Sequence, residues 1–103
     1  MLPVVDSPFP GSRGYLLAGA HGQVVFWHFA SGARVPRHQH GPQIGVVITG
    51  QVDLTTATST QTICEGGSFS LNDQEPHSAV VTPGTLVIEM FADPDRHTAR
   101  RPS

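Results

Sequence analysis

Two histidines separated by one residue, His38 and His40, stand just before an apolar run that begins at Gln43. The chain before them is expected to be extended, because Pro36 disfavours helical backbone in the residue that precedes it. Residues two apart in an extended chain point to one face and lie roughly 6.5–7 Å apart, so both imidazoles can converge on one ion. A Gly-Pro turn follows and can bring the Gln43 amide oxygen to the same point. Such a pair is also common in solvent-facing loops, so further ligands are needed.

A third histidine, His77, enters a later apolar run after the loop "DQEP". Imidazole nitrogens together with one carbonyl-type oxygen suit a borderline divalent ion such as Zn, Ni, Fe or Mn. Each residue alone has an ordinary interpretation as a loop or turn residue, so the prediction depends on their combination. The sequence therefore predicts one divalent transition-metal site, with His38, His40, Gln43 and His77 as its ligands.

Two residues are candidates to move a proton beside such an ion. In the last apolar run, 85–91, either the odd or the even positions face inward, and the odd set would place Glu89 inside. A carboxyl group in an apolar cavity has a raised pKa and can act as an acid or a base, whereas an outward Glu89 would be an ordinary surface residue. His28, in the apolar run 23–30, is the second catalytic candidate, with a structural histidine as the alternative.

Short strands must position these residues, because no stretch shows helical periodicity with caps over more than a turn. About seven to nine short apolar or alternating runs are separated by glycine- and proline-rich turns, which favours an all-β sandwich or barrel. A jelly roll suits this length and has an interior that can hold a ligand. We expect a single domain, 1–103, with an irregular N-terminal arm over 1–14, a core over 15–91 and a loose polar tail over 92–103.

The composition excludes several classes of function. The 103 residues carry a net charge of −2 and only 14% are charged, which gives no electrostatic footprint for nucleic acid. Cys64 is the only cysteine, so it forms no intrachain disulfide, and it is expected to be a small buried residue. The N-terminus lacks a signal-peptide pattern and no apolar stretch reaches membrane-spanning length, so we expect a cytoplasmic protein with no membrane partner. The low surface charge favours a homodimer.

Two spaced motifs resemble those of the cupin superfamily. The first is Gly32-x5-His38-x-His40-x2-Gln43-x6-Gly50, and the second is Gly66-x5-Asn72-x-Gln74-x2-His77. The second motif is degenerate, since asparagine and glutamine replace its usual proline and glycine. The resemblance spans residues 23–91 and implies a small RmlC-like cupin, with a double-stranded β-helix or jelly-roll barrel. Its register favours the odd set of positions in 85–91, which places Glu89 inside.

The resemblance departs from the usual pattern at Gln43, where most cupins have glutamate. Small cupins with glutamine here are similar to a subgroup that includes uronate-processing enzymes and many uncharacterised members. An amide leaves the charge of the ion uncompensated, so the site should favour an anionic or oxygen-rich ligand and act on it as a stronger Lewis acid. We therefore expect a metal-dependent enzyme acting on a small oxygenated molecule, a sugar acid or keto acid, by isomerase, lyase or oxygenase chemistry. The alternative is a non-catalytic cupin that binds a metal or a metabolite for sensing or storage.

Overall fold

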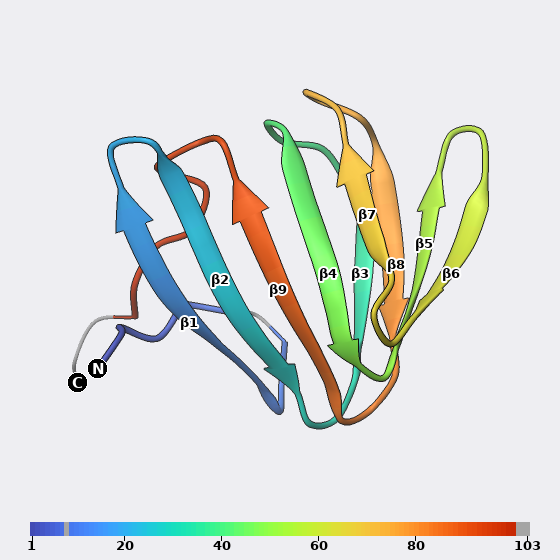
Figure 1. Cartoon of the computed structure of the whole chain (residues 1–103), viewed down its shortest axis with the longest axis horizontal. Helices are drawn as coiled ribbons and strands as arrows, with labels where there is room; N and C mark the ends of the chain where they lie inside the picture. The colour runs from blue at the N-terminus through green and yellow to red at the C-terminus, as the bar shows by residue number, and fades with distance from the viewer. Residues whose placement is uncertain (8, 101–103) are drawn as a thin grey trace.

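The computed structural model describes residues 1–7 and 9–100, and its regular structure consists of nine strands. The strands are β1 (Ser12–Gly19), β2 (Gly22–Phe29), β3 (Ala33–His38), β4 (Gln43–Thr49), β5 (Gln51–Thr56), β6 (Thr60–Cys64), β7 (Ser68–Leu71), β8 (His77–Val81) and β9 (Thr85–Phe91). They form a five-stranded sheet in the order β1-β2-β9-β4-β7 and a four-stranded sheet in the order β3-β8-β5-β6 (Figure 1). All strand pairs are antiparallel, and the predicted all-β jelly roll is confirmed.

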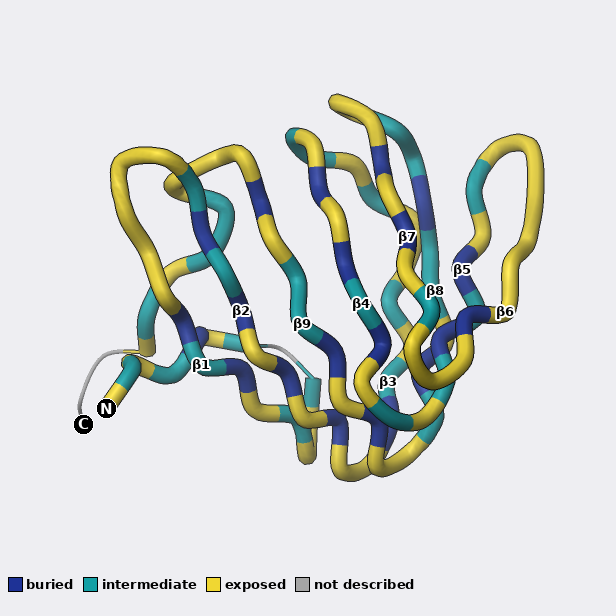
Figure 2. Tube along the Cα trace, in the orientation of Figure 1, coloured by how far each residue is buried: buried dark blue, intermediate teal, exposed yellow. Residues whose placement is uncertain are grey.

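The two sheets face each other because each strand alternates an inward apolar position with an outward one. In β2, buried and more exposed residues alternate along the strand, with Val25, Trp27 and Phe29 facing inward. Figure 2 shows the same alternation of buried and exposed segments along the other strands of this sheet. In β9 the odd positions are buried or face the interior, which puts Glu89 on the inner side, as the resemblance implied.

The described parts of both terminal segments are more ordered than the sequence indicated. The arm expected over 1–14 ends earlier, because β1 begins at Ser12, and Val4 forms an isolated bridge with Tyr15. The part of the tail within the described residues is not loose. Residues 93–100, called the C-terminal strap below, turn back from β9 and run past β2 and β1 toward the N-terminus (Figure 1). The remaining tail residues, 101–103, lie outside the described residues.

Two further expectations concern Cys64 and the membrane. Cys64 is exposed, because it follows the inward Ile63 at the end of the edge strand β6 and so takes an outward position. The expectation of a buried cysteine was therefore wrong. Across residues 1–7 and 9–100, we find no helix with the length and apolar character needed to cross a membrane.

Candidate metal centre

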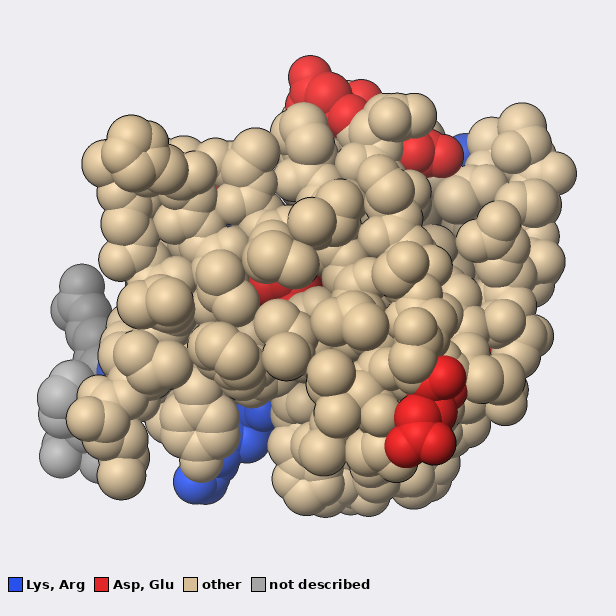
Figure 3. Space-filling view, in the orientation of Figure 1, with Lys and Arg blue, Asp and Glu red and all other residues tan. Residues whose placement is uncertain are grey.

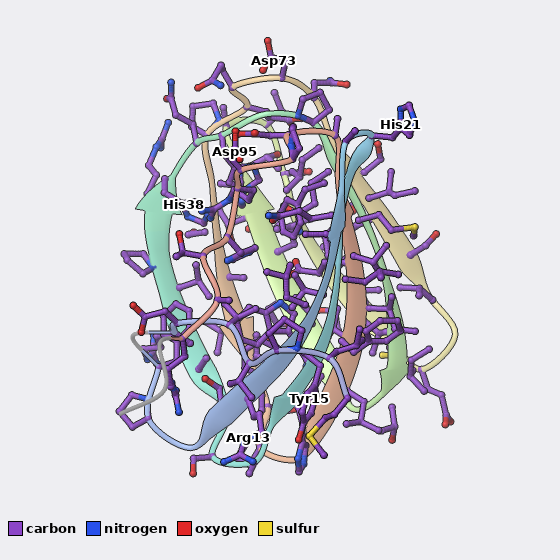
Figure 4. All side chains as sticks on the ribbon, turned by 90° about the vertical axis from the view of Figure 1, so that its left-hand side faces the viewer. Arg13, Tyr15, His21, His38, Asp73 and Asp95 are labelled. Carbon is purple, nitrogen blue, oxygen red and sulfur yellow. The ribbon has the colours of Figure 1, made fainter. Side chains whose placement is uncertain are left out.

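The predicted metal ligands come from strands of both sheets that begin or end near one another. His38 is the last residue of β3 and pairs with His77, the first residue of β8. His40 follows in the next turn, and Gln43 opens β4 in the opposite sheet. Figure 4 shows His38 in the same part of the molecule as Asp95 of the strap, with Arg13 at the opposite end. The spacing of the first motif therefore serves to carry the chain from one sheet to the other around this point.

The three histidines form one cluster. One ligand atom from each of His38, His40 and His77 lies within 4.8 Å of the others, a spacing that lets three nitrogens approach a common ion. The ring centroids are 4.3 Å apart for His38 and His77, 4.8 Å for His40 and His77, and 5.1 Å for His38 and His40. The structure thus brings together the three histidines that the sequence selected.

Backbone carbonyls determine which nitrogen of each ring is free. The Nδ1 atoms of His38, His40 and His77 lie 2.8–2.9 Å from main-chain carbonyl oxygens, which only accept hydrogen bonds. In the neutral form of each ring, Nδ1 therefore carries the proton and Nε2 keeps its lone pair. Burial is the main cause that lowers the pKa of both His40 and His77, which favours the neutral form that a metal ligand requires.

Gln43 and Glu89 form a pair beside this cluster. The Gln43 amide donates a short hydrogen bond from Nε2 to the Glu89 carboxylate, and so its Oε1 is left for another partner. Oε1 is buried and lacks any hydrogen bond from the described residues. A buried carbonyl oxygen without a donor is costly, and a bound cation would satisfy it. The hydrogen bond to Glu89 therefore fixes the amide so that Oε1 stays available to another partner.

The environment of Glu89 favours its protonated form. Burial raises the pKa of the Glu89 carboxyl from 4.5 to about 7, although the Trp27 indole N–H, the positive charge of Arg96 and the Gln43 amide each act to lower it. The Trp27 Nε1 atom approaches the carboxylate without meeting the geometry of a full hydrogen bond, and it has no other partner among the described residues. A carboxyl group with a pKa near neutrality can both hold and release a proton at physiological pH.

A cavity of about 420 Å³ lies between the sheets and reaches the histidine cluster. It has the size of a small-molecule site. Among the described residues, four buried side-chain polar atoms lack a hydrogen-bond partner, and all four belong to residues that line this cavity. They are Trp27 Nε1, Gln43 Oε1, Arg96 Nε and His97 Nε2. Such a concentration of unpaired polar atoms on a mostly apolar wall, beside the histidine cluster, indicates a ligand with several polar groups.

Sequence reasoning missed the contribution of the C-terminal strap. Arg96 and His97 both line the cavity, and the Arg96 guanidinium lies 5.7 Å from the centroid of the Phe91 ring. The strap is held there by Gln23, whose Nε2 donates to the carbonyls of Pro94 at 2.8 Å and of His97 at 3.0 Å. Its Oε1 accepts the His97 amide proton at 2.8 Å. The one residue in the sequence that could have indicated the position of the strap was Gln23, because it is a polar residue at an inward position of an apolar strand.

The second catalytic candidate lies elsewhere. His28 is exposed on the outer face of β2, because its neighbours Trp27 and Phe29 occupy the inward positions. It lines a separate surface depression together with Arg13 and Tyr15, and it is not among the residues that line the cavity. The structure therefore gives His28 no contact with the histidine cluster.

Comparisons with known proteins agree with this geometry. No family model and no curated protein sequence matches the chain. Among solved structures, KdgF from Halomonas sp. is similar, with 27% identity, a TM-score of 0.77, and coverage of 89% of this chain and 88% of that one. An RmlC-like cupin from Shewanella frigidimarina has 24% identity, a TM-score of 0.76, and coverage of 91% and 86%. The fold is that of a cupin.

One more distant solved structure is that of a protein with a metal centre. Oxalate decarboxylase from Bacillus subtilis, described as having Mn(II) centres, has 18% identity and a TM-score of 0.72. The match covers 82% of this chain and 26% of that chain, so it supports the shared fold alone. The candidate donors for a divalent metal in this chain are its own residues: three clustered imidazoles, with one unpaired amide oxygen on Gln43 beside them.

Proposed function

We propose that this cupin is a metal-dependent enzyme acting on a small, oxygen-rich organic anion, a sugar acid or keto acid. His38, His40, His77 and the Gln43 oxygen would hold a divalent transition metal. A metal bound there would polarise a carbonyl or hydroxyl oxygen of the substrate. Isomerase or lyase chemistry follows from proton transfer at such a polarised centre, and oxygenase chemistry is the alternative if the ion is iron.

The observation that favours an enzyme over a binding protein is Glu89. A non-catalytic cupin for sensing or storage needs no proton carrier. From the sequence alone, no ionisable residue besides the metal ligands had a definite inward position, which left that alternative open. Glu89 lines the cavity, contacts the predicted ligand Gln43 and has a pKa near neutrality. It can therefore take a proton from a carbon or hydroxyl group of a bound molecule and return it elsewhere.

The other polar residues of the cavity support an anionic substrate. The Arg96 guanidinium presents fixed donors beside the cavity, which suits a carboxylate group. Burial and the nearby Arg96 charge lower the pKa of His97 to about 4, so His97 is neutral and can accept or donate one hydrogen bond. Three neutral imidazoles and an amide would leave the positive charge of the metal uncompensated, which further favours a negative ligand.

Metal analysis and a single variant test the proposal. The protein, purified without a histidine tag, should contain close to one divalent transition metal per chain. Glu89→Gln should retain that metal while turnover of a uronate or related keto acid falls at least 100-fold. Glu65→Gln is the matched control, because Glu65 is exposed and does not line the cavity. It should leave the metal content and the turnover unchanged. Tight binding of these acids by wild type without turnover would instead support the non-catalytic function.

The homodimer and the cytoplasmic location remain predictions from the sequence. Neither is needed for the site proposed here, since the ligands and cavity-lining residues named above all come from one chain.

A further inference from the structure

The cavity between the sheets has one polar end, called the histidine end below. Strand register places His38 opposite His77 in one sheet and Gln43 opposite Phe91 in the other. The Phe91 ring centroid lies 5.6 Å from that of His40, so Gln43 and Phe91 stand at the same end as the three clustered histidines. All four predicted metal ligands therefore lie at this end.

The other polar groups of the cavity gather there too. The His97 ring centroid is 4.9 Å from that of Phe91, and the Arg96 guanidinium is 5.7 Å from it. The Glu89 carboxylate accepts the hydrogen bond from Gln43, and the unpaired indole N–H approaches the same carboxylate. The four unpaired polar atoms of the cavity are thus concentrated at or near the histidine end.

Farther along the strands, the wall formed by the four-stranded sheet is apolar. Two positions beyond His77, Ala79 pairs with Leu54, and two positions beyond that, Val81 pairs with Val52. These four apolar residues all line the cavity and define its apolar end. From His77 to Val81 the extended strand covers about 13 Å. The five-stranded sheet adds further apolar lining residues, namely Phe29, Phe69 and Val87.

The remaining polar lining residues lie on the side where the cavity reaches solvent. Asp6 and Thr98 line the cavity and are exposed. Ser7 lies there as well, and its hydroxyl forms a hydrogen bond with that of Ser12 at 3.2 Å. Side chains cover the five-stranded sheet when it is viewed from outside, which agrees with an opening on this other side (Figure 3). A ligand can therefore keep polar groups at the opening and at the histidine end, and only apolar groups at the apolar end.

The apolar end suits hydrocarbon and disfavours hydroxyl groups. The whole cavity measures about 420 Å³, and an apolar cavity of about 150 Å³ is already enough to bind benzene. A sugar acid carries a hydroxyl group on most of its carbons. Each hydroxyl buried at the apolar end without a partner would weaken binding roughly tenfold. Methylene groups in the same place would strengthen binding, because burial of apolar area is favourable.

We propose that the ligand of this cavity is amphipathic: a keto acid whose oxygen-bearing head lies at the histidine end and whose hydrocarbon chain extends to the apolar end. This inference rests on the proposed function and narrows its substrate class, because it selects a keto acid with an apolar chain over a sugar acid. The head meets the groups that lack partners, and the chain meets Val52, Leu54, Ala79 and Val81.

A chain-length series on the metal-loaded wild-type protein tests the proposal. The probes are pyruvate, α-ketobutyrate, α-ketovalerate and α-ketocaproate, with galacturonate as the sugar acid. Trp27 is the only tryptophan and lines the cavity, so stopped-flow fluorescence reads binding ahead of any turnover. Each added methylene should lower the dissociation constant about fourfold, which gives roughly 50-fold across the series. Galacturonate should bind more weakly than α-ketocaproate.

The series separates failure of this inference from failure of the proposed function. If the four keto acids bound equally well, or if galacturonate bound more tightly than α-ketocaproate, the amphipathic ligand would be wrong while the proposed enzyme would stand. If none of the five acids bound the metal-loaded protein, pyruvate included, the proposed function would be contradicted and this inference with it.

Ala79→Leu locates the hydrocarbon chain. The larger side chain fills part of the apolar end, so it should weaken binding of α-ketocaproate about tenfold and that of pyruvate less than about twofold. The metal content should not change. Ala57→Leu is the matched control, because Ala57 is exposed and does not line the cavity. Equal weakening of both acids by Ala79→Leu would place the chain elsewhere and overturn the proposal. The wild-type series decides the question without any variant.

Discussion

Replacement of Gln23 by alanine should release the C-terminal strap from the cavity. Gln23 is 4% exposed and makes three hydrogen bonds to the strap, two as donor and one as acceptor. Alanine at this position removes all three and leaves two carbonyls and one N–H without partners. The strap remains attached by other main-chain bonds, including Asp6 N to Thr98 O at 2.8 Å and Arg100 N to Val4 O at 2.6 Å.

The magnitude follows from the number of bonds lost. At about 1 kcal/mol net for each hydrogen bond, the free energy that keeps residues 94–97 closed should fall by about 3 kcal/mol. Each 1.4 kcal/mol corresponds to a factor of ten, so the open population should rise roughly 100-fold. When the strap opens, its carbonyls and N–H group can form hydrogen bonds with water. The free energy of global unfolding should therefore fall by less than the ~3 kcal/mol lost from strap closure.

Two probes report on the opening. Hydrogen exchange of the His97 amide, the proton that Gln23 accepts, should accelerate by about the same 100-fold factor. Trp27 is the only tryptophan and its ring lies 5.7 Å from that of His97, so acrylamide should quench its fluorescence more strongly in the variant. Gln61→Ala, at an exposed position on the edge strand β6, is the control. If His97 exchange changed less than threefold in a folded Gln23→Ala protein, Gln23 would not be the residue that holds the strap.

Three further outcomes are expected. Because folding raises the Glu89 pKa from 4.5 to about 7, metal-free protein should lose up to ~3 kcal/mol of stability as the pH rises from 4.5 to 7, and urea denaturation of Glu89→Gln should lack that loss. Folding lowers the His97 pKa from 6.5 to about 4, so stability should fall as the pH drops through that interval, and His97→Gln should show a smaller fall in the same titration. A Cβ atom at Gly45 would clash with the Phe69 ring, so Gly45→Ala should cost about 1–3 kcal/mol in thermal unfolding. Gly19→Ala, where a Cβ atom meets nothing within 4 Å, should be close to neutral.

The sequence predicted the fold and the histidine cluster for identifiable reasons. Alternating apolar residues and closely spaced turns specify short strands locally, and a ligand pair two residues apart needs only an extended chain to share a face. His77 was selected as a histidine that enters a later apolar run after a loop, and the second motif supported it even though two of the motif's usual residues are replaced. Strand alternation, turn spacing and closely spaced ligands all depend on residues that are near one another in the sequence.

The strap could not be predicted in the same way. Arg96 and His97 lie in a polar segment whose composition resembles a solvated tail, and their burial depends on Gln23, more than seventy positions earlier. The inward orientation of Glu89 was also ambiguous from β9 alone, because that strand carries apolar residues on both faces. For Cys64, a preference for burial was overridden by its outward position on an edge strand.

The departure at Gln43 has a physical explanation in the position of Glu89. A glutamate at position 43 would set two carboxylates against each other in a buried site, and like charges at that distance cannot both ionise. An amide avoids this repulsion because it donates from Nε2 to Glu89 and still offers Oε1 to an ion. In the proposed metal site the negative charge would therefore lie on Glu89, which contacts the proposed ligand Gln43 and can bind a proton near neutral pH. A carboxylate that coordinates a metal directly has little capacity to accept a proton. An acid–base enzyme at this site would therefore require an amide as the ligand at position 43 and a free carboxyl group at position 89.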